Sequence, residues 1–309
     1  MLTYPRTIRL GLLLLLIALP QVPLLACETC GCSNSSLFFG VMPQSHLIFA
    51  GIRYRGVSYL SHAESAVLRT KEHYQSAELW GRFYPFKRVQ VMAFVPYHIN
   101  EQQTRILTKT LRGVGDISVL AHYALLNTFM DDSKTLHLNH TLQVGGGVKL
   151  PTGQYRYDAY DLTQVANPNF QLGSGSLDWV TNVLYTMRAD NWGGSADLTA
   201  KLNTHNAEGY RFGHRLVGSA TVFRTFDKGG SAALMPYTGL FVEGYARDNV
   251  RGIADLKTGG WALLGTVGVE FTYKKLAVGT LVQVPLAHYL NRGELTPQNR
   301  LQIQTSYLF

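Results

Sequence analysis

The sequence predicts an all-β protein: a transmembrane antiparallel β-barrel of about 12 strands, of the outer-membrane type. Three observations lead to this prediction. The chain begins with an export segment, apolar and polar residues alternate with a period of two over most of the remainder, and short and long connections follow one another in turn. Only 16% of the 309 residues are charged, below the roughly 25% of ordinary soluble domains.

Residues 1–26 have the three parts of a secretory signal peptide. Arg6 and Arg9 supply the positive charge, "LGLLLLLIAL" supplies an apolar core, and Ala26 supplies the small residue before cleavage. The core has about ten residues, whereas a helix needs about 20 to cross a bilayer, so a membrane anchor is the disfavoured alternative. The net charge is +8, but no face gathers Lys and Arg, so we expect no nucleic-acid partner.

All three cysteines follow in "LLACETCGCSNSS", within a predicted periplasmic segment over residues 27–44. Four interpretations stay open. "LLAC" fits a lipoprotein cleavage site, which would make Cys27 the lipidated first residue. Alternatively, Cys27, Cys30 and Cys32 could bind Cu(I) or another soft metal as thiolates, with a histidine such as His46 as a further ligand. The others are a disulfide, as the periplasm favours, and a redox pair of Cys27 and Cys30.

Residues 45–309 form the predicted barrel. In the final "RLQIQTSYLF", Leu301, Ile303 and Tyr307 share one face, and Gln302 and Gln304 share the other. The stretches "WALLGTVGVEFTYK", "SADLTAKLN" and "TLHLNHTLQVGGGVKL" alternate in the same way. A soluble periplasmic β-protein with one wet sheet face is the alternative. Segments of about ten to fifteen residues are, however, longer than the usual five or six of globular strands.

The aromatic residues near the predicted strand ends support the barrel, because outer-membrane barrels carry aromatic girdles. These residues are Trp80, Tyr84, Trp179, Trp192, Trp261, Tyr273 and Tyr289. The chain also ends on Phe309, and a C-terminal aromatic after alternating apolar positions resembles the assembly signal of bacterial outer-membrane barrels.

Short connections are predicted near residues 85–88, 190–191, 227–230 and 274–275, with one of moderate length near 129–134. Longer ones are predicted at 61–72, 99–115, 151–173, 204–212, 247–258 and 288–299. Short turns on one side and long loops on the other is the plan of these barrels. An even strand count then places both termini in the periplasm. Loops 99–115 and 151–173 are candidates for folding inward as plugs.

Three glycine-rich blocks carry a family resemblance: "GVGD" at 113–116, "KLPTG" at 149–153 and "LGSGS" at 172–176. With their flanking strands they resemble an outer-membrane barrel family whose members are labelled as components of a meta-pathway of phenol degradation. The resemblance extends over roughly residues 45–309. The resemblance implies a transporter-like barrel. The glycines and prolines themselves serve turns and close backbone approach, so they indicate a fold and not a chemistry.

A barrel of this size has a narrow or partly plugged lumen. Charged and polar residues on the polar faces predict its wall. They are Arg53, Arg55, Glu78, Arg82, Asp178, Asn182, Arg188, Asp197, Lys201, Arg215, Glu243, Glu270 and Lys274. Such a wall suits water, ions or small polar solutes, and the alternative is that these residues pair across the lumen and seal it.

Two histidines, His122 and His137, are predicted to face the lumen on consecutive strands, where they could share a metal ion or simply form hydrogen bonds. No G-x-S-x-G motif groups a serine with a histidine and an acid, so we expect no enzyme.

The function expected from the sequence is passage of a small molecule or ion across the bacterial outer membrane. A link to copper handling through the cysteines is added, because a C-x-x-C-G-C start before such a barrel resembles proteins of Bacteroidetes-like bacteria. The alternative is a sealed structural or binding barrel that holds a periplasmic partner through its loops or its cysteine tail. Outer-membrane lipid is the expected surrounding in both cases.

Overall fold

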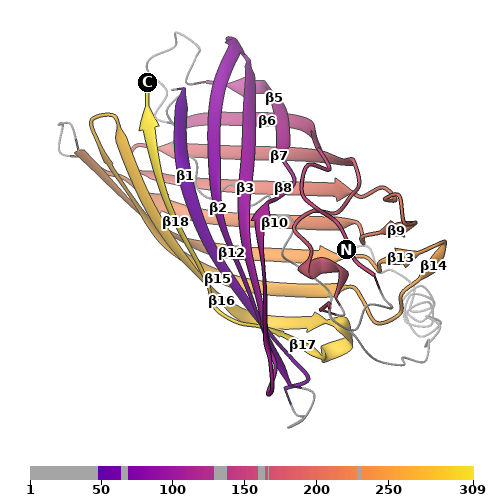
Figure 1. The fold of residues 1–309 in the computed structure, drawn as a ribbon. Coiled ribbons are helices and arrows are strands. Elements are labelled where there is room, and N and C mark those ends of the chain that lie inside the picture. Colours follow the sequence, from indigo (N-terminus) through magenta and orange to yellow (C-terminus); the bar gives the residue numbers. More distant parts are fainter. Residues whose placement is uncertain (1–47, 64–68, 129–137, 159–163, 166, 228–231) are drawn as a thin grey trace, which may run out of the picture.

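The computed structural model describes residues 48–63, 69–128, 138–158, 164–165, 167–227 and 232–309. They form a closed antiparallel barrel of 12 strands, which confirms the predicted fold class (Figure 1). The barrel closes where β1 (Phe49–Ser61) pairs with β18 (Arg300–Leu308), with Phe49 opposite Leu308. The predicted signal peptide, residues 1–26, and the cysteine segment, residues 27–44, lie outside the described residues.

Each strand pairs with its neighbours along the chain. Between β1 and β18, the wall consists of β2 (Thr70–Phe86), β3 (Val89–Gln103), β4 (Thr108–Val114), β5 (Ser118–Asn127), β6 (Leu138–Lys149), β7 (Asp178–Ala189), β8 (Trp192–Leu202), β10 (Arg215–Arg224), β12 (Ala232–Tyr245), β15 (Gly260–Tyr273) and β16 (Leu276–Leu290). β4 and β5 both pair with β3 and are two parts of one strand of the barrel, which makes 12. Shorter elements are η1 (Pro168–Phe170), β9 (Tyr210–Arg211), β11 (Phe226–Asp227), β13 (Asn249–Val250), β14 (Ile253–Ala254), η2 (Asn291–Gly293) and β17 (Leu295–Pro297). No helix in the described ranges is long and apolar enough to cross a membrane.

Side chains alternate between the two faces of the wall, as the period of two predicts. In β18, Gln302 and Gln304 are buried inside the barrel, whereas Leu301, Ile303 and Tyr307 are exposed on its outer surface. A closed sheet leaves no strand edge unpaired, so its backbone N–H and C=O groups are satisfied within the protein. Its outer surface can then be apolar while the interior is polar. The two faces predicted for this strand are confirmed.

Short turns lie at one end of the barrel and long connections at the other. The turns at residues 87–88, 190–191 and 274–275 are as short as predicted. Both described ends of the chain lie on the short-turn side, because Leu308 N donates to Lys275 O (2.7 Å) and Phe309 N donates to Ile48 O (2.9 Å). Figure 1 shows β9, β13, β14 and β17 gathered toward the opposite end.

The prediction of a long loop over residues 99–115 is wrong. Strand β3 continues to Gln103 and pairs with β4, so Glu101 lies opposite Thr110 and only residues 104–107 connect the two. The polar sequence of this stretch predicts a loop. Its threonines favour extended backbone, however, and the stretch forms a hairpin. β4 and β5 follow one another against β3, and the break between them falls at Gly115–Ile117.

Two predicted girdle residues face the lumen instead of the lipid side. The Trp80 side chain is 3% exposed and packs edge-on against Phe49, with ring centroids 4.5 Å apart. Tyr84 donates its hydroxyl hydrogen to Gln90 Oε1 at 3.0 Å. Both rings lie beside arginines inside the barrel: the Arg53 guanidinium lies 5.1 Å from the Trp80 ring and that of Arg82 lies 5.5 Å from the Tyr84 ring. The other girdle aromatics, Trp179, Trp192, Trp261, Tyr273 and Tyr289, are exposed on the outer face.

Candidate functional site

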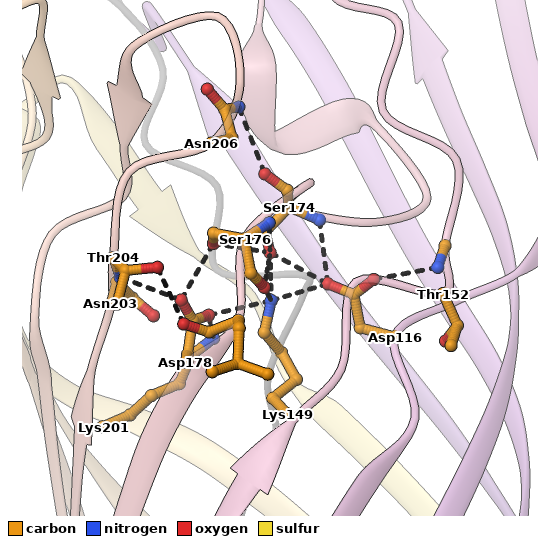
Figure 2. A network of polar contacts seen from close by, with 12 residues as sticks. Asp116, Lys149, Thr152, Ser174, Ser176, Asp178, Lys201, Asn203, Thr204 and Asn206 are labelled. Atoms are coloured by element: carbon orange, nitrogen blue, oxygen red, sulfur yellow. Dashed lines mark hydrogen bonds and ion pairs between the residues drawn. The ribbon is translucent and has the colours of Figure 1, made fainter.

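The long connection between β6 and β7, residues 150–177, is tied to the barrel wall by a buried network (Figure 2). Its centre is Lys149, whose Nζ lies 2.7 Å from Asp116 Oδ2 and 2.8 Å from Asp178 Oδ2. The same ammonium donates to Ser174 Oγ and, at 3.1 Å, to Ser176 O. All three charged side chains are at most 3% exposed, so their charges are neutralised by buried partners. Asp178 has a second cation, Lys201, whose Nζ lies 3.4 Å from Asp178 Oδ2.

This network brings the three glycine-rich blocks together. Asp116 Oδ1 accepts from Gly153 N at 2.9 Å, and its Oδ2 accepts from Ser174 N at 2.8 Å. A Cβ at Gly153 would lie 2.8 Å from Gly173 Cα, so side chains larger than hydrogen do not fit there. The blocks that carry the family resemblance therefore form the anchor of this connection, and the sequence signal for them was their shared glycines.

The far part of the same connection folds into the lumen. Asn167 Nδ2 donates to both carboxylate oxygens of Glu72 (3.4 and 3.3 Å) and to the Tyr74 hydroxyl (3.2 Å). Phe170 is 3% exposed, its ring centroid lies 6.4 Å from that of Tyr74, and its carbonyl accepts from Asn100 Nδ2 at 2.8 Å. Of the two loops expected as plugs, 151–173 thus sends residues 167–171 into the barrel mouth, and 99–115 is the hairpin described above.

Other long connections pack around this one. Asp248, between β12 and β13, accepts from Gly213 N at 2.6 Å and from the Tyr210 hydroxyl. The ring of Phe212 lies edge-on to that of Tyr155, with centroids 6.2 Å apart. Burial raises the pKa of the Asp248 carboxyl and that of the Tyr155 hydroxyl. The mouth is therefore a packed layer of loops.

A small cavity of about 30 Å³ lies in the lumen beneath the infolded loop. It reaches across the barrel, from Arg55, Ser76 and His98 on β1–β3 to Arg215 on β10 and Arg300 on β18. The apolar side chains that line it are Val57, Tyr59, Tyr74, Phe241 and Leu281.

One glutamate holds two of these arginines. Arg215 Nη2 lies 3.0 Å from Glu243 Oε2, and Arg300 contacts both carboxylate oxygens of Glu243. Arg300 Nη2 also donates to the Tyr59 hydroxyl at 3.2 Å. The group links β1, β10, β12 and β18 through the interior.

Nearer the short turns, aromatic rings and arginines fill the lumen. Arg53 forms an ion pair with Glu78 on the neighbouring strand and lies 5.5 Å from the Phe94 ring. The guanidinium of Arg82 lies 4.9 Å from the Phe49 ring. Arginines and aromatic rings thus pack together inside this half of the barrel.

The structure places the residues predicted to line the lumen as follows. Buried inside the barrel are Arg53, Glu78, Arg82, Asp178, Asn182, Asp197, Lys201, Arg215, Glu243 and Glu270. Arg55 is half-buried at the cavity, and Arg188 lies near the short turns, where its Nε donates to Asp190 O at 2.8 Å. The prediction that Lys274 lines the lumen is wrong. Strand β15 ends at Tyr273, and Lys274 lies in the exposed turn before β16 with a φ of 52°.

The candidate metal ligands are not brought together by the described residues. His122 faces inward, and its Nε2 lies 2.9 Å from Asn182 Oδ1. His137, Cys27, Cys30 and Cys32 lie outside the described residues. Within the part of the chain that the structure describes, no group of three or more His, Cys, Asp or Glu side chains could hold a metal ion.

Several residues of the site were not predicted: Glu72, Asp116, Lys149 and Arg300. Lys149 and Arg300 occupy polar positions of alternating strands, so the period of two contained the signal. The polar sequence around Glu72 predicts a loop over residues 61–72. In the structure the strand begins earlier, at Thr70, and includes Glu72.

No protein-family model and no curated protein matches the chain. Among solved structures, it is similar to the COG4313 outer membrane channel from Pseudomonas putida F1, with 14% identity and a TM-score of 0.61, over 87% of this chain and 100% of that one. The beta domain of the Bordetella autotransporter Brka has 10% identity and a TM-score of 0.49, over 85% of this chain and 100% of that one. The translocator domain of autotransporter NalP from Neisseria meningitidis has 12% identity and a TM-score of 0.42, over 86% and 89%.

At these identities the likeness concerns the fold, and only the first comparison is close enough to use in an argument. The chain has the barrel architecture of bacterial outer-membrane proteins.

Proposed function

We propose that the protein is an outer-membrane channel that passes a small polar or charged solute through a narrow lumen, with residues 167–171 restricting its mouth. The observation that carries the proposal is the insertion of Asn167 and Phe170 between the polar side chains of the lumen wall. An apolar outer surface with a charged interior suits passage of water-soluble species. The similar Pseudomonas protein, an outer membrane channel, supports the same role.

The same proposal places the protein in the bacterial outer membrane, with the short turns and both chain ends toward the periplasm. It assigns no catalytic role. The resemblance to the phenol-pathway family agrees with a transporter-like barrel.

Removing the loop tip tests the proposal. We expect the double variant Asn167→Ala, Phe170→Ala to raise single-channel conductance in planar bilayers by roughly twofold or more, because the tip narrows the aqueous path. Ile253→Ala, at an exposed position on β14, is the control and keeps the parent conductance. A parent protein and a double variant that both fail to conduct would contradict the channel.

Failure of both proteins to conduct would favour the alternative, a sealed barrel that holds a partner. A specific observation keeps this alternative in view: the buried charges at the anchor and at Glu243 are paired within the protein. Paired charges can close a lumen as well as line one.

The N-terminal cysteines remain a separate proposal: Cu(I) or another soft metal at Cys27, Cys30 and Cys32, with lipidation of Cys27 as the competing one. We expect the mature protein, purified from membranes, to start at Cys27 without lipid and to accept three alkylating groups. The measurement is intact mass before and after alkylation. A mass that includes a diacylglyceryl group on Cys27 would leave two thiols and rule out the three-thiolate site.

A further inference from the structure

Two buried carboxylates hold the loop tip, residues 167–171, in the barrel mouth. Glu72 of β2 is 1% exposed, and its two oxygens accept from Asn167 Nδ2 at 3.4 and 3.3 Å. Asp248, between β12 and β13, is 4% exposed and accepts a hydrogen bond from the Asn169 side chain. Two amides of the tip thus meet two acids, one on the barrel wall and one in the layer of loops.

The remaining partners of Glu72 are neutral donors. The Tyr74 hydroxyl donates to its Oε2 at 2.6 Å, and Gln102 Nε2 donates to its Oε1 at 2.8 Å. The other titratable neighbours are Tyr59, opposite Glu72 on β1, and Lys109 of β4, whose ammonium donates to a carbonyl of the loop at 2.7 Å. Within the part of the chain that the structure describes, Glu72 therefore forms no ion pair.

Asp248 is surrounded in a similar way. The Tyr210 hydroxyl and Gly213 N both donate to its carboxylate. Its charged neighbour Asp255 adds a further negative charge instead of a positive one. Among the described residues, the carboxylates that hold the tip are thus stabilised by hydrogen-bond donors and not by a lysine or an arginine.

This arrangement fits the ionised form of the two acids. An ionised carboxylate only accepts hydrogen bonds, and the contacts of Glu72 all come from donors. Hydrogen bonds to an ionised acceptor are about twice as strong as those between neutral groups. A protonated carboxyl loses this advantage, and its O–H is a donor placed among other donors.

We propose that Glu72 and Asp248 form a proton-sensitive clasp, which holds residues 167–171 in the mouth when the acids are ionised and releases them when the acids are protonated. The consequence for solute passage rests on the proposed channel, since release of the tip would widen the path. The anchor of the same connection differs, because its two carboxylates share the ammonium of Lys149. The connection therefore stays attached to the wall while its tip moves.

Hydrogen–deuterium exchange of the full-length protein in detergent measures opening of the tip directly. After correction for the intrinsic exchange rate, we expect the peptide with residues 167–171 to exchange about tenfold faster at about pH 4.5 than at about pH 7.5. Glu72→Gln should already exchange fast at the higher pH, because an amide carries no charge. Glu101→Gln removes a carboxylate from the neighbouring strand β3, opposite His73, and is the matched control that should behave as the parent does.

A second variant covers the case in which Glu72→Gln does not fold. Asn167→Asp is nearly isosteric and places a second carboxylate against Glu72. At neutral pH the two negative charges repel and the tip should exchange fast, whereas in acid the two groups can share a proton and the tip should be protected. The pH response of this variant is thus expected to be the inverse of the parent response, which general loosening of the loop would not produce.

Conductance in planar bilayers separates the clasp from the channel. Exchange of the tip that is equal at both pH values in the parent, or an acid response that is neither lost in Glu72→Gln nor inverted in Asn167→Asp, would overturn the clasp. An acid-dependent tip in a protein that does not conduct would leave the clasp standing and remove the channel. A conducting protein whose tip exchange is independent of pH would remove the clasp and leave the channel.

Discussion

Replacing Lys149 with methionine is expected to destabilise the barrel more than any other single change at the loop anchor. The variant leaves Asp116 and Asp178 buried without their common ammonium, which lies 2.7 and 2.8 Å from them. Removing one partner of a buried ion pair costs about 3–5 kcal/mol. The free energy of unfolding in denaturant, measured in detergent or vesicles, should fall by this amount. Protease should also cut the connection at residues 150–177 faster.

The control is Lys87→Met, because Lys87 lies in the exposed turn between β2 and β3 and its loss leaves no buried charge. It should unfold at the parent denaturant concentration. If Lys149→Met retained the parent stability and protease resistance, the network of Figure 2 would not be what holds the connection to the wall.

Replacing Glu243 with glutamine is expected to have an effect of similar size at the lumen cavity. The carboxylate is fully buried and is shared by Arg215 and Arg300, so the amide leaves two guanidiniums without their counter-charge. The expected loss is about 3–5 kcal/mol of unfolding free energy. If the protein conducts, its reversal potential in a KCl gradient should also shift toward that of chloride, because the lumen becomes more positive.

Glu208→Gln, in an exposed loop, changes the formal charge equally and should alter neither quantity. A Glu243→Gln protein that unfolds like the parent and keeps the parent reversal potential would show that the arginines are neutralised by something other than Glu243.

The strands and their faces could be predicted because a barrel wall repeats every two residues. Leu301 and Gln302 show it directly, one exposed and one buried. The same rule contained the correct position of Trp80, which is an even number of residues from Glu78 and Arg82 on β2 and therefore faces the lumen with them. The frequency of tryptophan in girdles predicts the outer face for Trp80, but the alternation of β2 determines the face that it takes.

The site was predictable only in part. Periodicity directs Arg215 and Glu243 inward but does not show that they meet Arg300, since this depends on how the strands are paired and tilted. The infolding of residues 167–171 depends on contacts such as Asn167 with Glu72, 95 residues away in sequence. No local pattern encodes a contact of that range.

The pairing of β1 with β18 has a consequence for biogenesis. Arg300 and the Tyr59 hydroxyl that it contacts are separated by 241 residues, and β1 finds its second neighbour only when the last strand is present. Contacts this distant in sequence form slowly, because the entropy of closing the intervening chain is lost before the contact can stabilise it. Until β18 is in place, β1 and β16 each have an edge open to pairing with other chains. A chaperone that shields these two edges would be needed most in that interval, and a chain truncated before Arg300 should accumulate there.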